Sequence, residues 1–288
     1  MNGILVIDKP ADWTSHDVVA KLRGALKIKR IGHGGTLDPM ATGVLPIFIG
    51  KATRAAEYLE NADKEYVAGL RLGLVTDTHD ITGNTLSISE ISVSTDDLLA
   101  TLPRFLGAQK QIPPMYSAIK IGGKKLYELA RRGVEVERPA RDINISNIEL
   151  LGGNGAEFKL KISCSKGTYI RTLCHDIGEA LGCGGVMSSL RRTKAGIFSI
   201  NEAHELDQVL KAAESADVTK HMLMIDKVFS MYPAITLGEA ETRKCINGAP
   251  FNLTGATDGI YRFYNHENEF MMLGKITFGT VKGLKSFF

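Results

Sequence analysis

The sequence contains no apolar run approaching the roughly 20 residues that a transmembrane helix needs. Its first ten residues lack the basic segment and the small-residue cleavage site of a secretory signal. The four cysteines lack CxxC spacing, which favours free thiols in a reducing compartment over a disulfide framework. We therefore expect a soluble, cytoplasmic protein without a membrane partner.

Metal-binding patterns are also missing. The seven histidines are scattered, without HExxH or a comparable ligand spacing. One local cluster, Asp77-Thr78-His79-Asp80, follows a strand pattern in a turn-rich segment, and we interpret it as the polar residues of a solvated loop. No nucleotide-cofactor motif is present either, so we expect neither a metal nor a cofactor.

The composition is that of a globular protein, with 44% hydrophobic and 23% charged residues in 288. This length exceeds that of a typical single domain and predicts one large domain plus a small one. Nothing in the sequence demands more than a monomer.

Positive charge is concentrated in one segment. The whole chain carries a net charge of only +3, whereas residues 104–141 hold nine basic residues against three glutamates. Two tyrosines, Tyr116 and Tyr127, lie among these basic side chains. Such a segment suits a nucleic-acid backbone, which attracts clustered positive charge. A solvated basic face without a partner is the alternative.

Residues 31–46, IGHGGTLDPMATGVLP, form the most informative stretch. Pro39 disfavours a helical conformation of the preceding Asp38, so this carboxylate is held in extended backbone. Gly34 and Gly35 allow another molecule to approach the main chain closely. An Asp-Pro pair alone indicates only a turn, but a rigid, weakly polar loop with a single acid indicates a catalytic carboxylate.

This stretch resembles the catalytic-aspartate loop of the bacterial TruB-type tRNA pseudouridine synthases, which follows the pattern GHxGxLDPxATG. Every fixed position of the pattern is matched, by Gly32, His33, Gly35, Leu37, Asp38, Pro39, Ala41, Thr42 and Gly43. One departure is Gly34, which stands where threonine is more common in the family. Five further segments match family motifs: Asp8-Lys9-Pro10, Lys64-Glu65-Tyr66, 113–128, 164–172 and Leu190-Arg191-Arg192.

The resemblance implies three catalytic residues. Asp38 would be the nucleophile, because an ionised carboxylate can attack at a glycosidic centre. Arg171 would be its ion-pair partner, favouring the charged form of the acid. Tyr66 would stack on the target uracil and assist removal of its carbon-bound proton.

Substrate-binding residues are implied in the same way. Tyr169 and Leu190 would shape the uridine pocket. Lys9 also belongs to the substrate-binding residues, where it would support the active-site loop. His33 would stack where the extruded uridine had been. The insertion would bind the RNA backbone through Lys120, Lys124, Lys125, Arg131 and Arg132.

The expected fold class is α+β, a pseudouridine-synthase fold with a mixed, mostly antiparallel sheet and flanking helices around a central cleft. Residues 1–232 would form the catalytic domain, with an RNA-gripping insertion at about 104–141, and residues 233–288 a small C-terminal PUA-like β domain. Patterns of alternation and helical spacing predict strands at 3–7, 65–74, 158–164, 260–264 and 270–273, and helices at 51–59, 124–132 and 170–181, with another begun by a Ser15 cap.

The implied function is isomerisation of the T-loop uridine of tRNA, uridine 55 in standard tRNA numbering, to pseudouridine, with the T-arm stem-loop as partner. One alternative is a relative that works within a guide-RNA particle; the short N-terminus and the basic insertion argue against it. Another is a T-arm-binding protein or RNA-folding chaperone, a role that can coexist with catalysis. Whether Asp38 attacks the base or the sugar is left open by the sequence.

Overall fold

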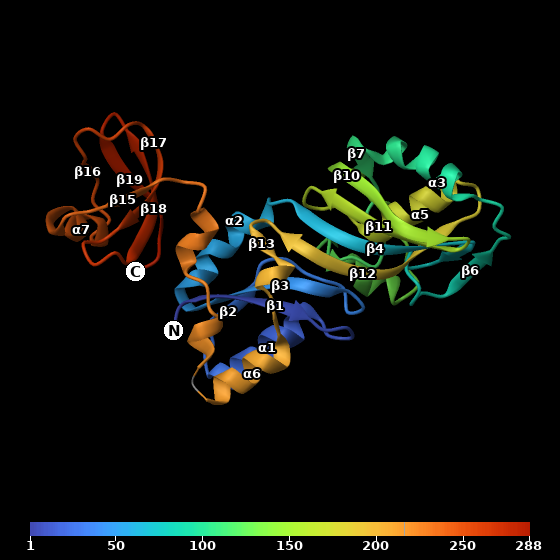
Figure 1. Ribbon diagram of the computed structural model, residues 1–288, viewed down its shortest axis with the longest axis horizontal. Helices are drawn as coiled ribbons and strands as arrows, with labels where there is room; N and C mark the ends of the chain where they lie inside the picture. Colours follow the sequence, from blue (N-terminus) through green and yellow to red (C-terminus); the bar gives the residue numbers. More distant parts are fainter. Residues whose placement is uncertain (216) are drawn as a thin grey trace.

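The computed structural model describes residues 1–215 and 217–288 (Figure 1). Its larger part is built on a ten-stranded sheet in which eight strands follow the order β14-β1-β3-β12-β4-β11-β10-β7, while β2 pairs with β3 and β13 with β12. The strands are β1 (Gly3–Lys9), β2 (Ile31–His33), β3 (Thr42–Ile49), β4 (Lys64–Leu72), β7 (Gly107–Gln111), β10 (Arg141–Asn154), β11 (Glu157–Cys164), β12 (Gly185–Ala195), β13 (Phe198–Ser199) and β14 (His204–Glu205).

Two of the strand pairs, β1 with β14 and β3 with β12, are parallel, and the other pairs of this sheet are antiparallel. The predicted mixed, mostly antiparallel sheet is therefore confirmed. In β4 the alternation that predicted a strand places Tyr66, Ala68, Leu70 and Leu72 on one buried face. Strand β1 is buried on both faces, in keeping with its nearly continuous apolar run.

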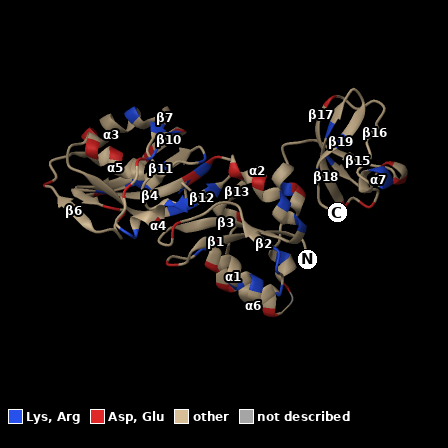
Figure 2. Ribbon diagram, turned by 180° about the vertical axis from the view of Figure 1, so that it is seen from behind, with Lys and Arg blue, Asp and Glu red and all other residues tan. Residues whose placement is uncertain are grey.

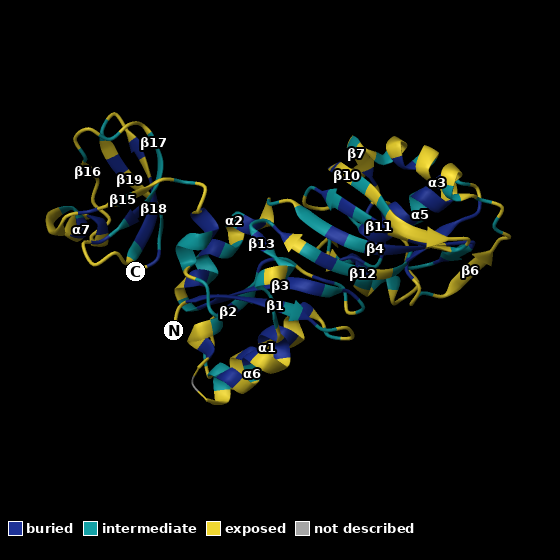
Figure 3. Ribbon diagram, viewed as in Figure 1, coloured by how far each residue is buried: buried dark blue, intermediate teal, exposed yellow. Residues whose placement is uncertain are grey.

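Helices cover the sheet in two groups. Near β1 and β3 lie α1 (Ser15–Leu26) and α6 (Leu206–Glu214), and near β10 and β11 lie α3 (Thr95–Thr101) and α5 (Ile170–Ala180) (Figure 1). Figure 3 shows buried residues along the central strands and exposed ones on the outer faces of α1 and α6. None of the helices formed by residues 1–215 and 217–288 has the length and apolar character needed to cross a membrane.

The start of α1 corrects one prediction. Thr14, and not Ser15, is the N-cap, because its side chain accepts a hydrogen bond from the Asp17 N–H in a capping box. Ser15 is buried and turned inward, toward the backbone of Leu37. The helix expected at 51–59 is divided into a 3-10 segment, η1 (Gly50–Ala55), and the short α2 (Ala56–Glu60).

The basic segment contains a short β-hairpin, followed by a helix within the predicted range 124–132. They are β8 (Lys120–Ile121), β9 (Lys124–Lys125) and α4 (Leu126–Ala130). Strands β7 and β10 on either side belong to the main sheet, so the segment outside that sheet runs from 112 to 140. We use the term insertion for residues 112–140 below. The remaining elements of the large part are β5 (Leu74–Thr76), β6 (Thr85–Ile88), η2 (Leu102–Phe105), η3 (Ile200–Glu202), η4 (Val218–His221) and η5 (Ile225–Phe229).

A separate five-stranded sheet follows, in the order β15-β17-β18-β19-β16, and confirms the expected small C-terminal β domain (Figure 1). Its elements are β15 (Ala234–Thr236), α7 (Glu239–Ile246), β16 (Phe251–Asn252), β17 (Gly259–Tyr264), β18 (Phe270–Thr277) and β19 (Thr280–Ser286). It has its own apolar core and contacts the large part through Leu273 and Phe287, which pack in one cluster with Phe229. Arg54 reinforces this contact by donating to the Ser286 carbonyl at 2.9 Å.

Candidate active site

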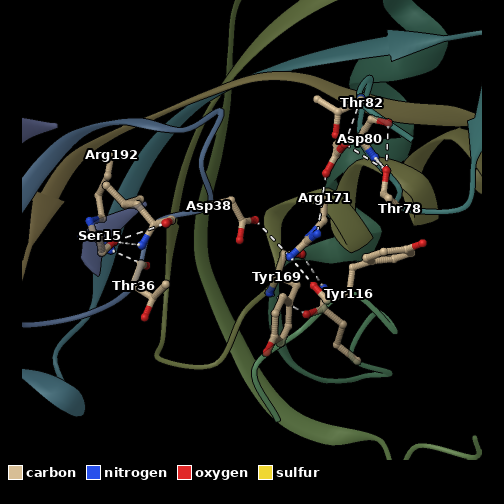
Figure 4. A network of polar contacts seen from close by, with 12 residues as sticks. Ser15, Thr36, Asp38, Thr78, Asp80, Thr82, Tyr116, Tyr169, Arg171 and Arg192 are labelled. Atoms are coloured by element: carbon tan, nitrogen blue, oxygen red, sulfur yellow. Dashed lines mark hydrogen bonds and ion pairs between the residues drawn. The ribbon is translucent and has the colours of Figure 1, made fainter. Parts of the chain in front are cut away.

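The centre of the site is an ion pair between Asp38 and Arg171. Asp38 lies in the loop between β2 and β3, whereas Arg171 lies in the first turn of α5. One carboxylate oxygen of Asp38, Oδ2, is 3.0 Å from Nη2 of Arg171. Figure 4 shows the two side chains pointing toward each other from these separate elements. These two residues are 133 positions apart in the sequence, and the family motifs predict that they pair.

Arg171 is almost fully enclosed, with 7% of its side chain exposed, and it has two further partners. Its Nη1 is 3.6 Å from Oδ2 of Asp80, and its Nη2 donates to the Tyr116 carbonyl at 2.8 Å. The side chain of Asp38 retains 38% exposure. The arginine is thus fixed from three sides, while the carboxylate of Asp38 keeps an accessible surface.

Asp80 corrects the interpretation of residues 77–80 as a solvated loop. Only 6% of its side chain is exposed, and its Oδ1 accepts hydrogen bonds from the hydroxyls of Thr78 at 2.9 Å and Thr82 at 2.6 Å (Figure 4). The loop is fastened to β12, because Ile81 N–H donates to the Met187 carbonyl at 3.0 Å. Local sequence gave no sign of this burial, which depends on packing against distant strands.

Burial raises the pKa of Asp38 above its ordinary value. The guanidinium of Arg171 opposes this rise, the charge of Asp80 adds to it, and Lys9 opposes it more weakly. Arg171 therefore favours the ionised form of Asp38, although desolvation remains the dominant influence. Arg171 and Asp80 shift the pKa of Asp38 in opposite directions.

The loop that carries Asp38 is supported from below by Lys9. This side chain is fully buried, and its ammonium donates to the carbonyls of Pro10 at 2.8 Å, Trp13 at 2.6 Å and Pro39 at 3.0 Å. Burial lowers the pKa of Lys9 to about 8. Since all three ammonium hydrogens are directed to main-chain carbonyls, the geometry favours loop support for Lys9 and corrects its inclusion among substrate-contacting residues.

Arg192 fastens the same loop to the sheet. It is 1% exposed, and its guanidinium donates to the carbonyls of Val44 at 2.7 Å, Gly35 at 3.1 Å and Thr36 at 3.2 Å. Gly43 has φ +99°, and a Cβ there would lie 2.2 Å from the Arg192 carbonyl, so β3 and β12 approach each other closely only with glycine at this position. The family motif Leu190-Arg191-Arg192 includes this arginine, but the resemblance gave a role only to Leu190.

The other expected pocket residues lie on neighbouring elements. Tyr66 on β4 and Leu190 on β12 are both buried, and Tyr169 directly precedes α5. Burial raises the pKa of Tyr66, and the charge of Asp38 contributes to the rise, which reflects their proximity. His33 ends β2 and is half-buried; burial lowers its pKa, which favours the neutral imidazole.

The five basic residues expected to contact RNA lie together in the insertion. Four of them are exposed, namely Lys120, Lys124, Arg131 and Arg132, whereas Lys125 is half-buried. Lys125 Nζ and Arg131 Cζ each lie 5.4 Å from the centre of the Tyr127 ring, a distance typical of cation–π contacts. Figure 2 shows that lysine and arginine also occur on the main and C-terminal sheets.

The arrangement suits covalent or acid–base chemistry at a base or sugar, with an accessible carboxylate, an arginine that favours its ionisation and a buried tyrosine whose pKa the carboxylate charge helps to raise. In residues 1–215 and 217–288, no three His, Cys, Asp or Glu side chains are grouped as ligands for a metal ion.

Comparison with known proteins identifies the family of the chain. Residues 23–170 match the model of the TruB family pseudouridylate synthase N-terminal domain, and residues 171–230 match that of the tRNA pseudouridylate synthase B C-terminal domain. The tRNA pseudouridine synthase B of Clostridium kluyveri is 41% identical over 279 residues, covering 95% of each chain. That of Alkaliphilus oremlandii is 47% identical over 248 residues, covering 86% of this chain and 82% of the relative.

Solved structures give the same result for the fold. A chain in the crystal structure of a Cbf5-Nop10-Gar1 complex is 27% identical, with a TM-score of 0.75, and the match covers 99% of this chain and 85% of the other. A chain of an H/ACA RNP bound to a substrate RNA containing 2′-deoxyuridine is 26% identical, with a TM-score of 0.74 and the same coverage. By its sequence and its fold, this chain belongs to the TruB family of pseudouridylate synthases.

Proposed function

We propose that the protein converts the T-loop uridine of tRNA, uridine 55, to pseudouridine, with Asp38 as the nucleophile. The observation that carries the proposal is the contact of 3.0 Å between the accessible Asp38 carboxylate and the enclosed guanidinium of Arg171. Relatives at 41% and 47% identity are named tRNA pseudouridine synthase B, which supports tRNA as the substrate.

The chemistry needs little beyond these side chains. The bond between ribose and the uracil nitrogen breaks, the uracil turns, and a new bond forms from ribose to a carbon of the base, which then loses its hydrogen as a proton. No electron is transferred to or from the substrate. Asp38 attacks at the sugar or at the base, and both routes require its ionised form. Tyr66 is buried and its pKa is raised, so its side chain is a neutral phenol. We propose that it relays the departing proton: its oxygen accepts the proton from the base carbon while its own hydroxyl proton passes to water.

The target uridine must leave its stack to reach Asp38, because the reacting bond is otherwise enclosed by neighbouring bases. We assign Tyr169 and Leu190 to the walls of the receiving pocket, on the strength of their positions at the start of α5 and on β12. His33 lies at the end of β2, just before the loop of Asp38, where a neutral imidazole can stack in the vacated place.

Replacing His33 by Ala is expected to slow the reaction far less than replacing Asp38 by Ala. The histidine recovers only part of the unstacking cost of a few kcal/mol, so we expect a loss of about tenfold, expressed mainly in KM. Initial rates over a range of RNA concentrations measure this split. Complete loss with both variants would contradict the division of roles between His33 and Asp38.

Asp80→Asn should reduce the rate and shift its pH dependence in a defined direction. The variant loses the charge that helps to hold Arg171, which we expect to slow the reaction about tenfold at pH 7.5. The same charge raises the pKa of Asp38, so its removal lowers that pKa and moves the acid limb of the rate profile to lower pH. Asp77→Asn is the control, because Asp77 lies in the same loop but is hydrogen-bonded to Asn84. It should leave the rate and its pH dependence unchanged.

RNA binding is proposed for two further regions. The exposed basic residues of the insertion would bind phosphates of the T-arm, because their charge is clustered and accessible. Residues 233–288 would extend the RNA-binding surface as a PUA-like domain attached to a catalytic domain of residues 1–232. Salt sensitivity of RNA affinity, compared between wild type and a Lys124→Ala, Arg132→Ala double variant, tests the first of these assignments.

The deciding experiment is tritium release from T-arm stem-loop RNA labelled at uracil carbon 5, with purified protein and no added guide RNA. Release from the wild-type stem-loop, but not from one with cytidine in place of uridine 55, supports the proposal. Release only when a guide RNA is supplied would favour the particle-bound alternative. Tight binding without release would favour an RNA-binding protein or chaperone.

A further inference from the structure

A buried glutamine holds the beginning of the catalytic helix. Tyr169 is the N-cap of α5 and has no capping hydrogen bond from its own side chain. The amide of Gln111 binds this residue from outside the helix: its Oε1 accepts from the Tyr169 N–H at 2.8 Å, and its Nε2 donates to the Tyr169 carbonyl at 3.0 Å. Both backbone polar groups of Tyr169 are thus paired with one side chain.

Gln111 connects the main sheet to the start of α5. It is 5% exposed and ends β7, where it pairs with Arg141 of β10, so its backbone is part of the main sheet. Its partner Tyr169 is two residues before Arg171, and the Arg171 Cζ atom lies 6.0 Å from the centre of the Tyr169 ring. A shift of the Tyr169 peptide would therefore displace a pocket aromatic and the partner of the nucleophile together.

The same glutamine is the last residue before the insertion. Five residues later, the Tyr116 carbonyl accepts the hydrogen bond from Arg171 at 2.8 Å. The base of the insertion therefore contacts the start of α5 at two points, one through a side chain and one through the main chain. RNA bound by the insertion and the ion pair of Asp38 with Arg171 share this short connection.

We propose that Gln111 is a positioning residue of the isomerase, which fixes Tyr169 and Arg171 in the geometry needed for reaction and ties them to the base of the insertion. The proposal rests on the function proposed above, because it assumes that Tyr169 and Arg171 act on the substrate. Misplacement of reacting groups by about 1 Å can cost 10²-fold in rate, so the expected effect is on kcat and not on KM.

The first test compares Gln111→Met with Gln109→Met in single-turnover assays on the T-arm stem-loop. Gln109 lies on the same strand, and its amide donates to the nearby Phe105 carbonyl instead of to α5. We expect Gln111→Met to reduce the rate constant at least about tenfold, with RNA affinity within threefold of wild type. Gln109→Met should behave as wild type. A folded Gln111→Met protein with a rate within twofold of wild type would overturn the proposal.

The second test uses Gln111→Glu, which reports positioning through pH. A protonated carboxyl has one donor and one acceptor, so it can make both bonds to the Tyr169 peptide, whereas a carboxylate can only accept and would repel the Tyr169 carbonyl. Burial raises the pKa of such a carboxyl. We therefore expect the rate of this variant to fall at higher pH as the carboxyl ionises, a limb that wild type lacks.

The pH titration also distinguishes lost positioning from lost folding, because it compares the rates of the same variant at different pH values. Circular dichroism at each pH confirms that the variant is folded. A Gln111→Glu profile parallel to that of wild type would show that the contact stabilises the helix without positioning the reacting groups. Failure of the proposed function is recognised separately, because wild type would then release no tritium.

Discussion

Replacing Asp38 by Asn is expected to lower the single-turnover rate of pseudouridine formation by at least about a thousandfold. Asparagine has nearly the same shape as aspartate but carries no ionised oxygen, so it cannot attack the substrate. The loop should persist, because its supports from Lys9, Ser15 and Arg192 reach main-chain atoms and not the carboxylate. Tritium release and RNA affinity, measured in parallel, should show lost chemistry with a dissociation constant within threefold of wild type.

Asp12→Asn is the matched control for this experiment. Asp12 is exposed, and its main-chain N–H donates to the Pro39 carbonyl of the same loop at 2.9 Å. Its φ of +64° also suits asparagine. The control should retain wild-type rate, and a comparable loss in both variants would indicate a disturbed loop instead of a missing nucleophile.

Arg171→Lys is expected to lower the rate at least about a hundredfold and to move the acid limb of the pH profile upward. A lysine keeps the positive charge but cannot reach Asp38, Asp80 and the Tyr116 carbonyl in the geometry of the guanidinium. With weaker opposition to desolvation, the pKa of Asp38 rises further. Because the nucleophile must be ionised, activity is then lost at a higher pH as the solution is acidified.

The direction of this shift separates electrostatic from structural damage. Asp80→Asn should move the acid limb to lower pH, whereas Arg171→Lys should move it to higher pH. The two variants are therefore expected to shift the limb in opposite directions. Arg171→Ala is less informative, because an unpaired buried partner such as Asp80 costs about 3–5 kcal/mol of stability. An acid limb unmoved by Arg171→Lys, in a protein with normal thermal unfolding, would show that Arg171 does not set the ionisation of Asp38.

Local sequence patterns were sufficient to predict several elements of the structure. Strand β4 follows from the alternation of Tyr66, Ala68, Leu70 and Leu72, and α5 from the helical spacing that ends at Leu181, with Gly182 beyond it in the left-handed conformation that glycine favours. The loop of Asp38 was predicted from its match to every fixed position of the family pattern GHxGxLDPxATG.

Contacts between segments that are distant in the sequence could not be predicted from local patterns. The burial of Asp80 arises from the attachment of its loop to β12, and the clamping role of Arg192 arises from the pairing of β12 with β3. Strand β12 itself escaped prediction because the pairs Ser188-Ser189 and Arg191-Arg192 in its interior interrupt the alternation of polar and apolar residues. Gln111 gave no signal at all, since its partner is a main-chain peptide.

The position of β12 between β3 and β4 has a consequence for how the chain is made. Strands β3 and β4 are close in sequence, but more than a hundred residues separate the end of β4 at Leu72 from the start of β12 at Gly185. At about 5–20 residues per second, roughly 6–22 s of translation pass before the strand that joins them emerges from the ribosome. During that interval the edge of β4 that receives β12 is unpaired, as is β3 at Thr42 and Gly43, and such edges are prone to wrong pairing. A chain that terminates before Gly185 would leave two half-sheets, one bearing the loop of Asp38 and the other Tyr66, so these two residues join one sheet only after β12 has been made.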